Sequence, residues 1–254
     1  TYPEQLIINK SLTVHSTGGA AVTTVGANLY LVWIQASDVT LDGFTITNPT
    51  AMSTADNSAI ICTGAGNVSN IKILNNIIES PASPSRPSAD FGTFGINCIT
   101  GGSLQNIEVA WNIFRNIHAP ALPASSPPVA IAIFFYSDTT SSGINIHDNE
   151  IYNITSGSSA VRARGITISL NVSNVSITCN TIRNNGVGVR VTGSAGSGVE
   201  VHYNNIYDNT VYGLWNASPW LVDAENNWWG AANGPSGLGS GSGDAVSNTG
   251  SGSV

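Results

Sequence analysis

Charged residues are scarce in this chain: Asp, Glu, Lys and Arg make up 9% of its 254 residues, against about 25% in an average globular protein. Basic residues are the scarcest, with Lys10 and Lys72 as the two lysines and a net charge of −7. A protein that binds nucleic acid needs a basic patch to replace counterions on the phosphates, so this composition argues against nucleic acid as a partner. With 41% hydrophobic residues, the chain is not disordered by composition either.

Other signals are missing as well. No apolar run approaches the roughly 18 residues that span a membrane, and no segment has the pattern of a signal peptide, although Thr1 in place of Met is compatible with a removed leader. The three cysteines, Cys62, Cys98 and Cys179, follow no metal-binding spacing, and we expect buried free thiols. There is no P-loop, HExxH or nucleophile elbow, so the sequence predicts neither a cofactor nor a metal site.

What the chain has in abundance is a β-rich repeat with a central Asn. The motif is apolar-x-apolar, two or three polar residues including the Asn, one spacer and a large apolar residue. A shorter version, "VTLDGF", places Asp42 in the Asn column and Phe44 in the apolar column. The Asn column of the full copies contains Asn76, Asn112, Asn149, Asn180, Asn204 and Asn226, each followed two residues later by Ile78, Phe114, Ile151, Ile182, Ile206 and Trp228.

A second β-rich run lies between consecutive copies, as in "GVGVRVTG" and "RARGITISL". Strand, turn and strand at a shortening period are typical of a solenoid of stacked turns. Equivalent residues of neighbouring turns then form columns about 4.8 Å apart. We therefore expect an apolar column inside and an asparagine column whose amides are linked from turn to turn.

On these motifs the chain resembles the right-handed parallel β-helix repeat proteins. The resemblance covers nearly the whole chain, from "TYPEQLIINKSLTV" to the "NNWWG" and "GPSG" of a closing turn. It implies an all-β fold with a single right-handed parallel β-helix over residues 1–237, roughly seven to nine turns long, and a Gly/Ser-rich tail or truncated closing turn over 238–254. That family includes lyases, hydrolases, epimerases, adhesins and surface proteins, so the resemblance alone does not give an activity.

Catalytic groups are thinly spread. The closest acid pairs are Asp148 with Glu150, which we interpret as a polar turn, and Asp223 with Glu225, which we interpret as part of a polar end turn of the solenoid. His147 and His202 share a column position and are interpreted as solvated turn residues. An alternative remains open: a polysaccharide lyase or epimerase on an anionic glycan, with Tyr152 or Tyr207 beside an arginine cluster. That cluster contains Arg162, Arg164, Arg183 and Arg190.

Two outward columns are candidates for carbohydrate binding, because sugar rings stack on aromatic side chains while Arg donates to hydroxyls or carboxylates. The first follows the inward apolar residue, and it begins with Thr45 and Glu79. The second is aligned on glycines and contains Asn97 and Thr167 before its candidates. The candidate binding residues are Arg115, Tyr152, Arg183, Tyr207 and Trp229 in the first column and Arg190 and Trp215 in the second.

Three insertions, 80–90, 119–128 and 156–160, fall after the repeat strand and before the second strand, so we expect them at one corner of the solenoid. The favoured hypothesis is a non-catalytic extracellular or cell-surface β-helix, structural, adhesive or filament-forming, with a carbohydrate-binding face. Its partners would be a polysaccharide or cell-surface glycan, or a second copy joined end to end at the exposed strand edges. Candidate glycosylation sequons are Asn9, Asn67, Asn153, Asn171, Asn174 and Asn216.

Overall fold

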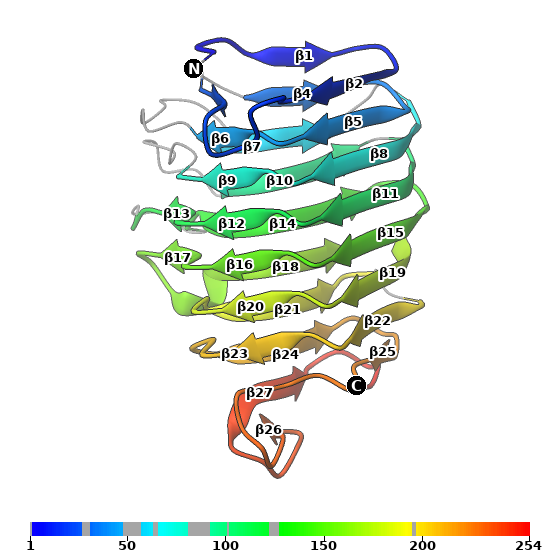
Figure 1. Ribbon diagram of the computed structural model, residues 1–254. Helices are drawn as coiled ribbons and strands as arrows, with labels where there is room; N and C mark the ends of the chain where they lie inside the picture. The colour runs from blue at the N-terminus through cyan, green and yellow to red at the C-terminus, as the bar shows by residue number, and fades with distance from the viewer. Residues whose placement is uncertain are drawn as a thin grey trace.

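The protein consists of long parallel β-sheets that the chain visits in turn. The computed structural model describes residues 2–26, 31–47, 57–62, 66–80, 92–100, 102–121, 127–194 and 197–254. Within them there is no α-helix, and one 3-10 turn, η1, covers Ala160–Arg162. The chain passes repeatedly from a ten-stranded to an eight-stranded and then to a seven-stranded sheet, so that strands of successive passes stack on one another (Figure 1).

Every strand pairing in these sheets is parallel, which agrees with the parallel solenoid expected from the repeat. The ten-stranded sheet contains, in spatial order, β1 (Leu6–Ile8), β4 (Val32–Ile34), β7 (Asn57–Cys62), β10 (Gly92–Thr100), β14 (Val129–Ser137), β18 (Ala163–Ser169), β21 (Val187–Thr192), β24 (Tyr212–Ala217), β27 (Gly243–Asn248) and β26 (Pro235–Gly237). The Gly/Ser-rich segment after residue 237 therefore supplies a strand of this sheet, β27, next to β24.

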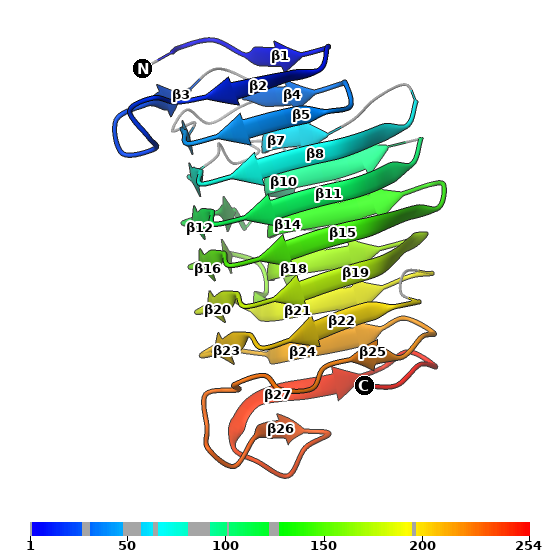
Figure 2. The same cartoon turned by 45° about the vertical axis from the view of Figure 1, so that its right-hand side comes forward.

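The other two large sheets carry the repeated motif (Figure 2). The eight-stranded sheet contains β2 (Leu12–His15), β5 (Val39–Asp42), β8 (Val68–Leu74), β11 (Leu104–Ala110), β15 (Ser141–His147), β19 (Val172–Thr178), β22 (Val199–His202) and β25 (Val222–Asp223). The seven-stranded sheet contains β3 (Thr24–Val25), β6 (Thr45–Thr47), β9 (Ile77–Glu79), β12 (Ile113–Arg115), β16 (Glu150–Tyr152), β20 (Thr181–Arg183) and β23 (Asn205–Tyr207).

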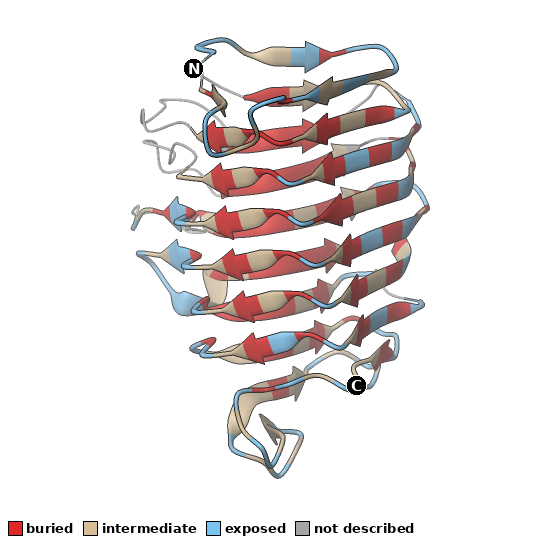
Figure 3. Cartoon of the chain, in the orientation of Figure 1, coloured by how far each residue is buried: buried red, intermediate tan, exposed pale blue. Residues whose placement is uncertain are grey.

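Alternating side chains of the strands point inward and form the core, as the alternation of buried and exposed residues in Figure 3 shows. One inward column of the seven-stranded sheet runs through Ile78, Phe114, Ile151, Ile182 and Ile206, all fully buried. Because each residue lies directly over its equivalent in the next turn, the β-branched and aromatic side chains stack like with like.

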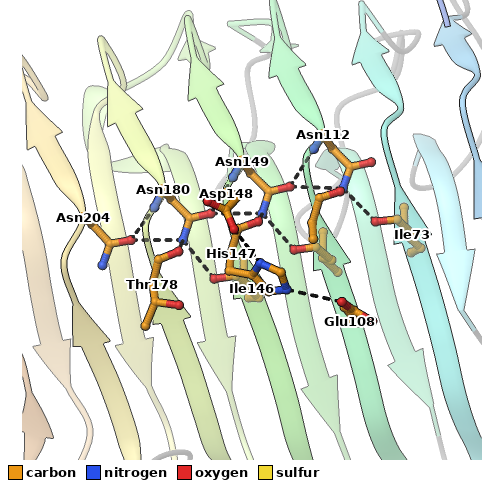
Figure 4. A network of polar contacts seen from close by, with 12 residues as sticks. Ile73, Glu108, Asn112, Ile146, His147, Asp148, Asn149, Thr178, Asn180 and Asn204 are labelled. Carbon is orange, nitrogen blue, oxygen red and sulfur yellow. Dashed lines mark hydrogen bonds and ion pairs between the residues drawn. The ribbon is translucent and has the colours of Figure 1, made fainter. Parts of the chain in front are cut away.

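An asparagine ladder runs along the corner between the eight- and seven-stranded sheets. Each backbone N–H donates to the side-chain oxygen of the next Asn at 2.9–3.0 Å, for example from Asn112 to Asn149 and from Asn149 to Asn180 (Figure 4). Each side-chain amide also donates to backbone carbonyls, as Asn112 does to Ile73 and Ala110. The asparagine ladder consists of Asn76, Asn112, Asn149, Asn180, Asn204 and Asn227.

The sequence frame was wrong by one residue in the last copy. Val222, and not Leu221, pairs with Val199, and Asn227, and not Asn226, accepts from the N–H of Asn204. Trp229 therefore lies in the inward column, 5% exposed, whereas Trp228 is 46% exposed. This is the reverse of the predicted orientation, and it excludes Trp229 from the carbohydrate-binding candidates.

The predicted frame of the shorter copy, "VTLDGF", was also wrong. Ile46 pairs with Ile78, and Phe44 takes the ladder position, because its N–H donates to the side chain of Asn76 at 3.0 Å. This copy is thus a full repeat with Phe in place of Asn, and Asp42 lies outside the ladder. Thr47, and not Thr45, is the neighbour of Glu79 in the outward column.

The insertions occur where the chain passes from the seven-stranded to the ten-stranded sheet. The second and third carry β13 (His118–Ala119) and β17 (Thr155–Ser156), which pair with each other. Most of 80–90 and the segment 122–126 lie outside the described residues. The insertions therefore begin at one corner, beside the ten-stranded sheet that follows them in the chain.

Candidate functional site

Three arginines without an ion-paired carboxylate lie on or beside the ten-stranded sheet. Arg164 is on β18, Arg190 on the adjacent β21, and Arg162 on η1 just before β18. Among the described residues, ion pairs connect Lys72, Arg115 and Arg183 to carboxylates, and these three arginines take part in none. We call Arg162, Arg164 and Arg190, together with Trp215, the arginine face.

Burial and mutual repulsion make these guanidinium groups poorly compensated. Burial, followed by the charges of Arg190 and Arg162, lowers the pKa of Arg164 to about 9. Burial and the charge of Arg162 also lower the pKa of Arg190. A half-buried cation with a lowered pKa is stabilised by an anion that enters its surroundings. The arginine face therefore has the electrostatics of an anion-binding surface.

Local contacts hold the guanidinium groups in place. Nη1 of Arg162 donates to the carbonyl of Pro127 at 2.5 Å, which ties the arginine to the end of the second insertion. Nε of Arg164 donates to the carbonyl of Val161 at 2.9 Å. Each group keeps further N–H donors in its planar fork, and a bidentate carboxylate or sulfate is the ligand that matches that fork.

Aromatic rings border the arginines. The guanidinium carbon of Arg190 lies 4.5 Å from the ring centroid of Trp215, and Tyr212 lies 5.6 Å from Trp215. Thr167, Arg190 and Trp215 are direct neighbours in strand pairing, as the glycine alignment of the sequence predicts. A cation and an aromatic plane side by side provide both contacts that an acidic sugar offers, its charge and its C–H face.

Buried polar atoms on this sheet have no partner. Nε of Arg190, Oγ1 of Thr167 and Oδ1 of Asn97 are buried without a hydrogen bond. All three residues belong to one column, in which Phe134 lies between Asn97 and Thr167. Because buried polar groups in native proteins are nearly always paired, these orphaned atoms mark a place where a polar ligand or water completes the structure.

The first predicted column, on the seven-stranded sheet, contains arginines whose charges are already neutralised. Arg115, Tyr152, Arg183 and Tyr207 are successive neighbours on β12, β16, β20 and β23. The guanidinium of Arg183 lies 4.4 Å from the ring of Tyr152.

Each arginine of this column has a carboxylate partner. Nε of Arg115 lies 2.6 Å from Glu79, and Nη2 of Arg183 lies 2.8 Å from Glu150. Hydrogen bonds to Tyr152 and Glu79 raise the pKa of Arg115, and the contact with Glu150 raises that of Arg183. These paired charges stabilise the stacking of the turns and leave little demand for an anionic ligand.

The structure divides the arginine cluster of the alternative hypothesis. Arg164 and Arg190 lie on adjacent strands of the ten-stranded sheet, with Arg162 just before β18, whereas Arg183 lies on the seven-stranded sheet with Tyr152 and Tyr207. The sequence did not single out Tyr212 or Phe134 as parts of the site. Phe134 was hidden inside the apolar run "VAIAIFFYSD", which has Ala132 where the aligned strands have glycine.

The sequons differ in accessibility. Asn9, Asn67, Asn153, Asn171 and Asn174 are exposed. Asn216 is fully buried; its amide donates to the carbonyls of Trp220 and Ser253, and its oxygen accepts from Ser218. A glycan on Asn216 is therefore incompatible with the folded protein.

Cysteines and metal ligands add no further site. Cys62 and Cys98 are buried as expected, and burial followed by contact with Cys62 raises the pKa of Cys98. Cys179 is exposed, which corrects the prediction, because it occupies a corner residue with a φ of 57°. No group of three or more His, Cys, Asp or Glu suited to a metal ion occurs in the part of the chain that the structure describes.

No helix among the described residues is long and apolar enough to cross a membrane. Comparisons with protein-family models, with curated proteins and with solved structures find no match for this chain.

Proposed function

We propose that the chain is a single right-handed parallel β-helix of extracellular or cell-surface type that binds an acidic polysaccharide on the arginine face. The observation that carries the proposal is the set of three arginines without carboxylates in a protein of net charge −7. Neutralising their mutual repulsion favours a ligand with repeated negative charges. Trp215 and Tyr212 add a surface on which sugar rings can stack.

The role we propose is binding without catalysis. Among the described residues, no ion pair joins a carboxylate to Arg162, Arg164 or Arg190, and the carboxylates paired with Lys72, Arg115 and Arg183 lie on the other two sheets. A glycosidase mechanism would need two such groups about 5–10 Å apart. Adhesion to a matrix or cell surface needs only the binding face.

A glycan array with uronate, sulfated and neutral polysaccharides tests this proposal. We expect binding to acidic glycans that weakens with salt, and at least a tenfold loss of affinity in Arg190→Gln. Arg115→Gln, in the neutralised column, is the matched control and should retain binding. Acidic-glycan binding that does not weaken with salt, or full affinity for acidic glycans in Arg190→Gln, would contradict the proposal.

One observation favours the alternative, a lyase or epimerase acting on the same anionic glycan. A guanidinium with a pKa of about 9, as at Arg164, releases a proton more readily than an ordinary arginine and is better suited to act as a base. Depolymerisation assays on uronate polysaccharides, with ultraviolet detection of unsaturated products, separate the two functions. Products that vanish in Arg164→Lys would establish the enzyme.

End-to-end association of copies remains a second partner proposal. Trp220, Leu221 and Leu238 expose large apolar surfaces near the C-terminal end of the stack. The N–H of Val222 donates to the carbonyl of Ser253 at 2.9 Å, so the last residues cover part of this end and weaken the case. Analytical ultracentrifugation over a wide concentration range decides it, since a constant monomer mass would refute association.

A further inference from the structure

The corner that carries the asparagine ladder contains two aromatic residues in an unfavourable conformation. The residue before each ladder asparagine has a positive φ, between 53° and 60°. Asn and Asp tolerate this left-handed conformation, whereas bulky side chains rarely adopt it. The residues at this position are Asn75, Trp111, Asp148, Cys179, Tyr203 and Asn226.

The fold gains little burial from the two aromatic side chains. Trp111 is 50% exposed and Tyr203 is 64% exposed. Asn or Asp would satisfy the backbone at lower cost, as Asn75 and Asp148 do. Strained residues whose side chains do not pack in the core are found preferentially at functional surfaces. The aromatic rings are therefore better explained by a contact outside the molecule.

Each ring meets a histidine that lies within ion-pair distance of a carboxylate. The rings of Trp111 and His147 lie 5.2 Å apart at an angle of 84°. Nδ1 of His147 lies 2.8 Å from Asp148, and Nε2 lies 3.3 Å from Glu108 (Figure 4). Glu108 also pairs with Lys72 at 2.7 Å. These contacts hold the His147 imidazole nearly perpendicular to the indole ring of Trp111.

The second unit repeats this arrangement at Tyr203. The rings of His202 and Tyr203 lie 6.1 Å apart at 81°, and Nε2 of His202 lies 3.0 Å from Oδ1 of Asp223. The neighbouring His202 lowers the pKa of Asp223. Trp111 and Tyr203 thus form two similar units of aromatic ring, imidazole and carboxylate along one corner, which we call the aromatic corner.

The two units lie on one line along the stack. Trp111 follows β11 and Tyr203 follows β22, and β15 and β19 are the strands between them. Three strand spacings separate the rings by about 14 Å along the stack. The corner residues between them are Asp148, which is polar, and Cys179, which is exposed, and both side chains are small. An extended chain can therefore contact both rings in succession.

We propose that the aromatic corner binds an uncharged oligosaccharide chain that stacks on Trp111 and Tyr203. The carboxylates Glu108, Asp148 and Asp223 disfavour an anionic chain, so the ligand differs from that of the arginine face. Glu108 is paired with Lys72, and the exposed oxygens of Asp148 and Asp223 accept hydrogen bonds from sugar hydroxyls. This site is independent of the arginine face and does not require it.

Isothermal titration with neutral hexasaccharides of glucose, xylose and mannose tests the site, using wild type, Trp111→Asn and Tyr203→Asn. We expect at least one hexasaccharide to bind, and each variant to lose affinity by tenfold or more. Both variants should melt at the same or a higher temperature, because Asn suits the left-handed corner. Trp220→Asn, at an equally exposed tryptophan away from the corner, is the matched control.

The charged probes separate this site from the arginine face. A galacturonate hexamer should lose affinity in Arg190→Gln and keep it in Trp111→Asn. The inference fails if no neutral hexasaccharide binds, if Trp111→Asn binds it like wild type, or if a cationic glucosamine hexamer binds the corner more tightly. If the wild-type protein binds a neutral hexasaccharide but not the galacturonate hexamer, the arginine face is refuted and the aromatic corner stands.

Discussion

The asparagine ladder and the arginine face both bury polar side chains, but they differ in whether the buried atoms have hydrogen-bond partners. In the ladder, the side chain of Asn149 accepts from Asn112 and donates to Val109, His147 and Asn180. On the arginine face, Nε of Arg190 and Oγ1 of Thr167 are buried with no partner. A satisfied network stabilises a fold, whereas an unsatisfied one costs free energy until a ligand completes it. The comparison separates a structural region from a functional one.

Replacing a ladder asparagine should have the largest effect on stability. Asn149→Ala removes the oxygen that accepts from the N–H and the side-chain amide of Asn112, and the amide that donates to the Val109 carbonyl, so we expect a loss of about 3 kcal/mol in the free energy of unfolding. Urea denaturation followed by circular dichroism measures it. A loss below about 0.5 kcal/mol would mean that the ladder is not the structural region.

Replacing an arginine of the arginine face should raise the free energy of unfolding and not lower it. Arg164→Met removes a buried charge without a partner, and we expect the protein to gain about 1–2 kcal/mol while acidic-glycan binding falls. The pH dependence checks the cause. Because folding lowers the pKa of Arg164 to about 9, stability should rise as the pH passes through 9, and this rise should be smaller in Arg164→Met, which keeps Arg190.

The end of a second, shorter ladder offers a smaller test. Asn185 donates to Asn209, and the N–H and amide of Asn209 both donate to Asp244 at 2.8–2.9 Å. Burial raises the pKa of Asp244, so its ionised form is disfavoured in the fold. Stability from this group is greatest below the ordinary carboxyl pKa and declines as the pH rises toward the folded-state pKa.

Asp244→Asn continues the ladder with a neutral acceptor. We expect a gain of about 1 kcal/mol at pH 7, the net value of a typical hydrogen bond, and none at pH 3. Thermal melts at the two pH values measure the difference. An equal gain at both values would assign the effect to packing and not to the charge.

The smallest expected effect compares two buried hydroxyls. Thr167→Val removes an unpaired hydroxyl and should be neutral or stabilising by about 0.5 kcal/mol. Ser141→Ala removes a hydroxyl that accepts from the N–H of Leu104 at 2.7 Å, and should destabilise by about 1 kcal/mol. If both changes destabilise equally, the distinction between paired and unpaired buried polar groups does not hold.

Sequence periodicity predicted much of the architecture, because equivalent residues must stack in a solenoid. The ladder from Asn76 to Asn204 and the adjacency of Arg190 and Trp215 follow from it. The frame failed where a copy offers two alternatives. In "LVDAENNWWG" both Leu221 and Val222 can begin the strand and both Trp residues can end it, and only the pairing of Val222 with Val199 selects the register.

The candidate site was harder to predict, since it depends on what is missing around each charge. Spacing places Arg183 and Arg190 in similar positions of successive strands, yet Arg183 has Glu150 beside it and Arg190 has no carboxylate. The strained corner was invisible for a similar reason. Trp111 reads as an ordinary turn residue until its φ of 56° is known.

The starting point of the asparagine ladder has a mechanical consequence. The N–H of Phe44 donates to the side-chain oxygen of Asn76, the first asparagine of the ladder, and among the described residues no asparagine of an earlier turn extends it. Because each turn of such a stack contacts only its neighbours, a pulling force would extend the molecule turn by turn. The first turns should yield at the lowest force, and the ladder-bearing turns should then give a series of higher, evenly matched force peaks.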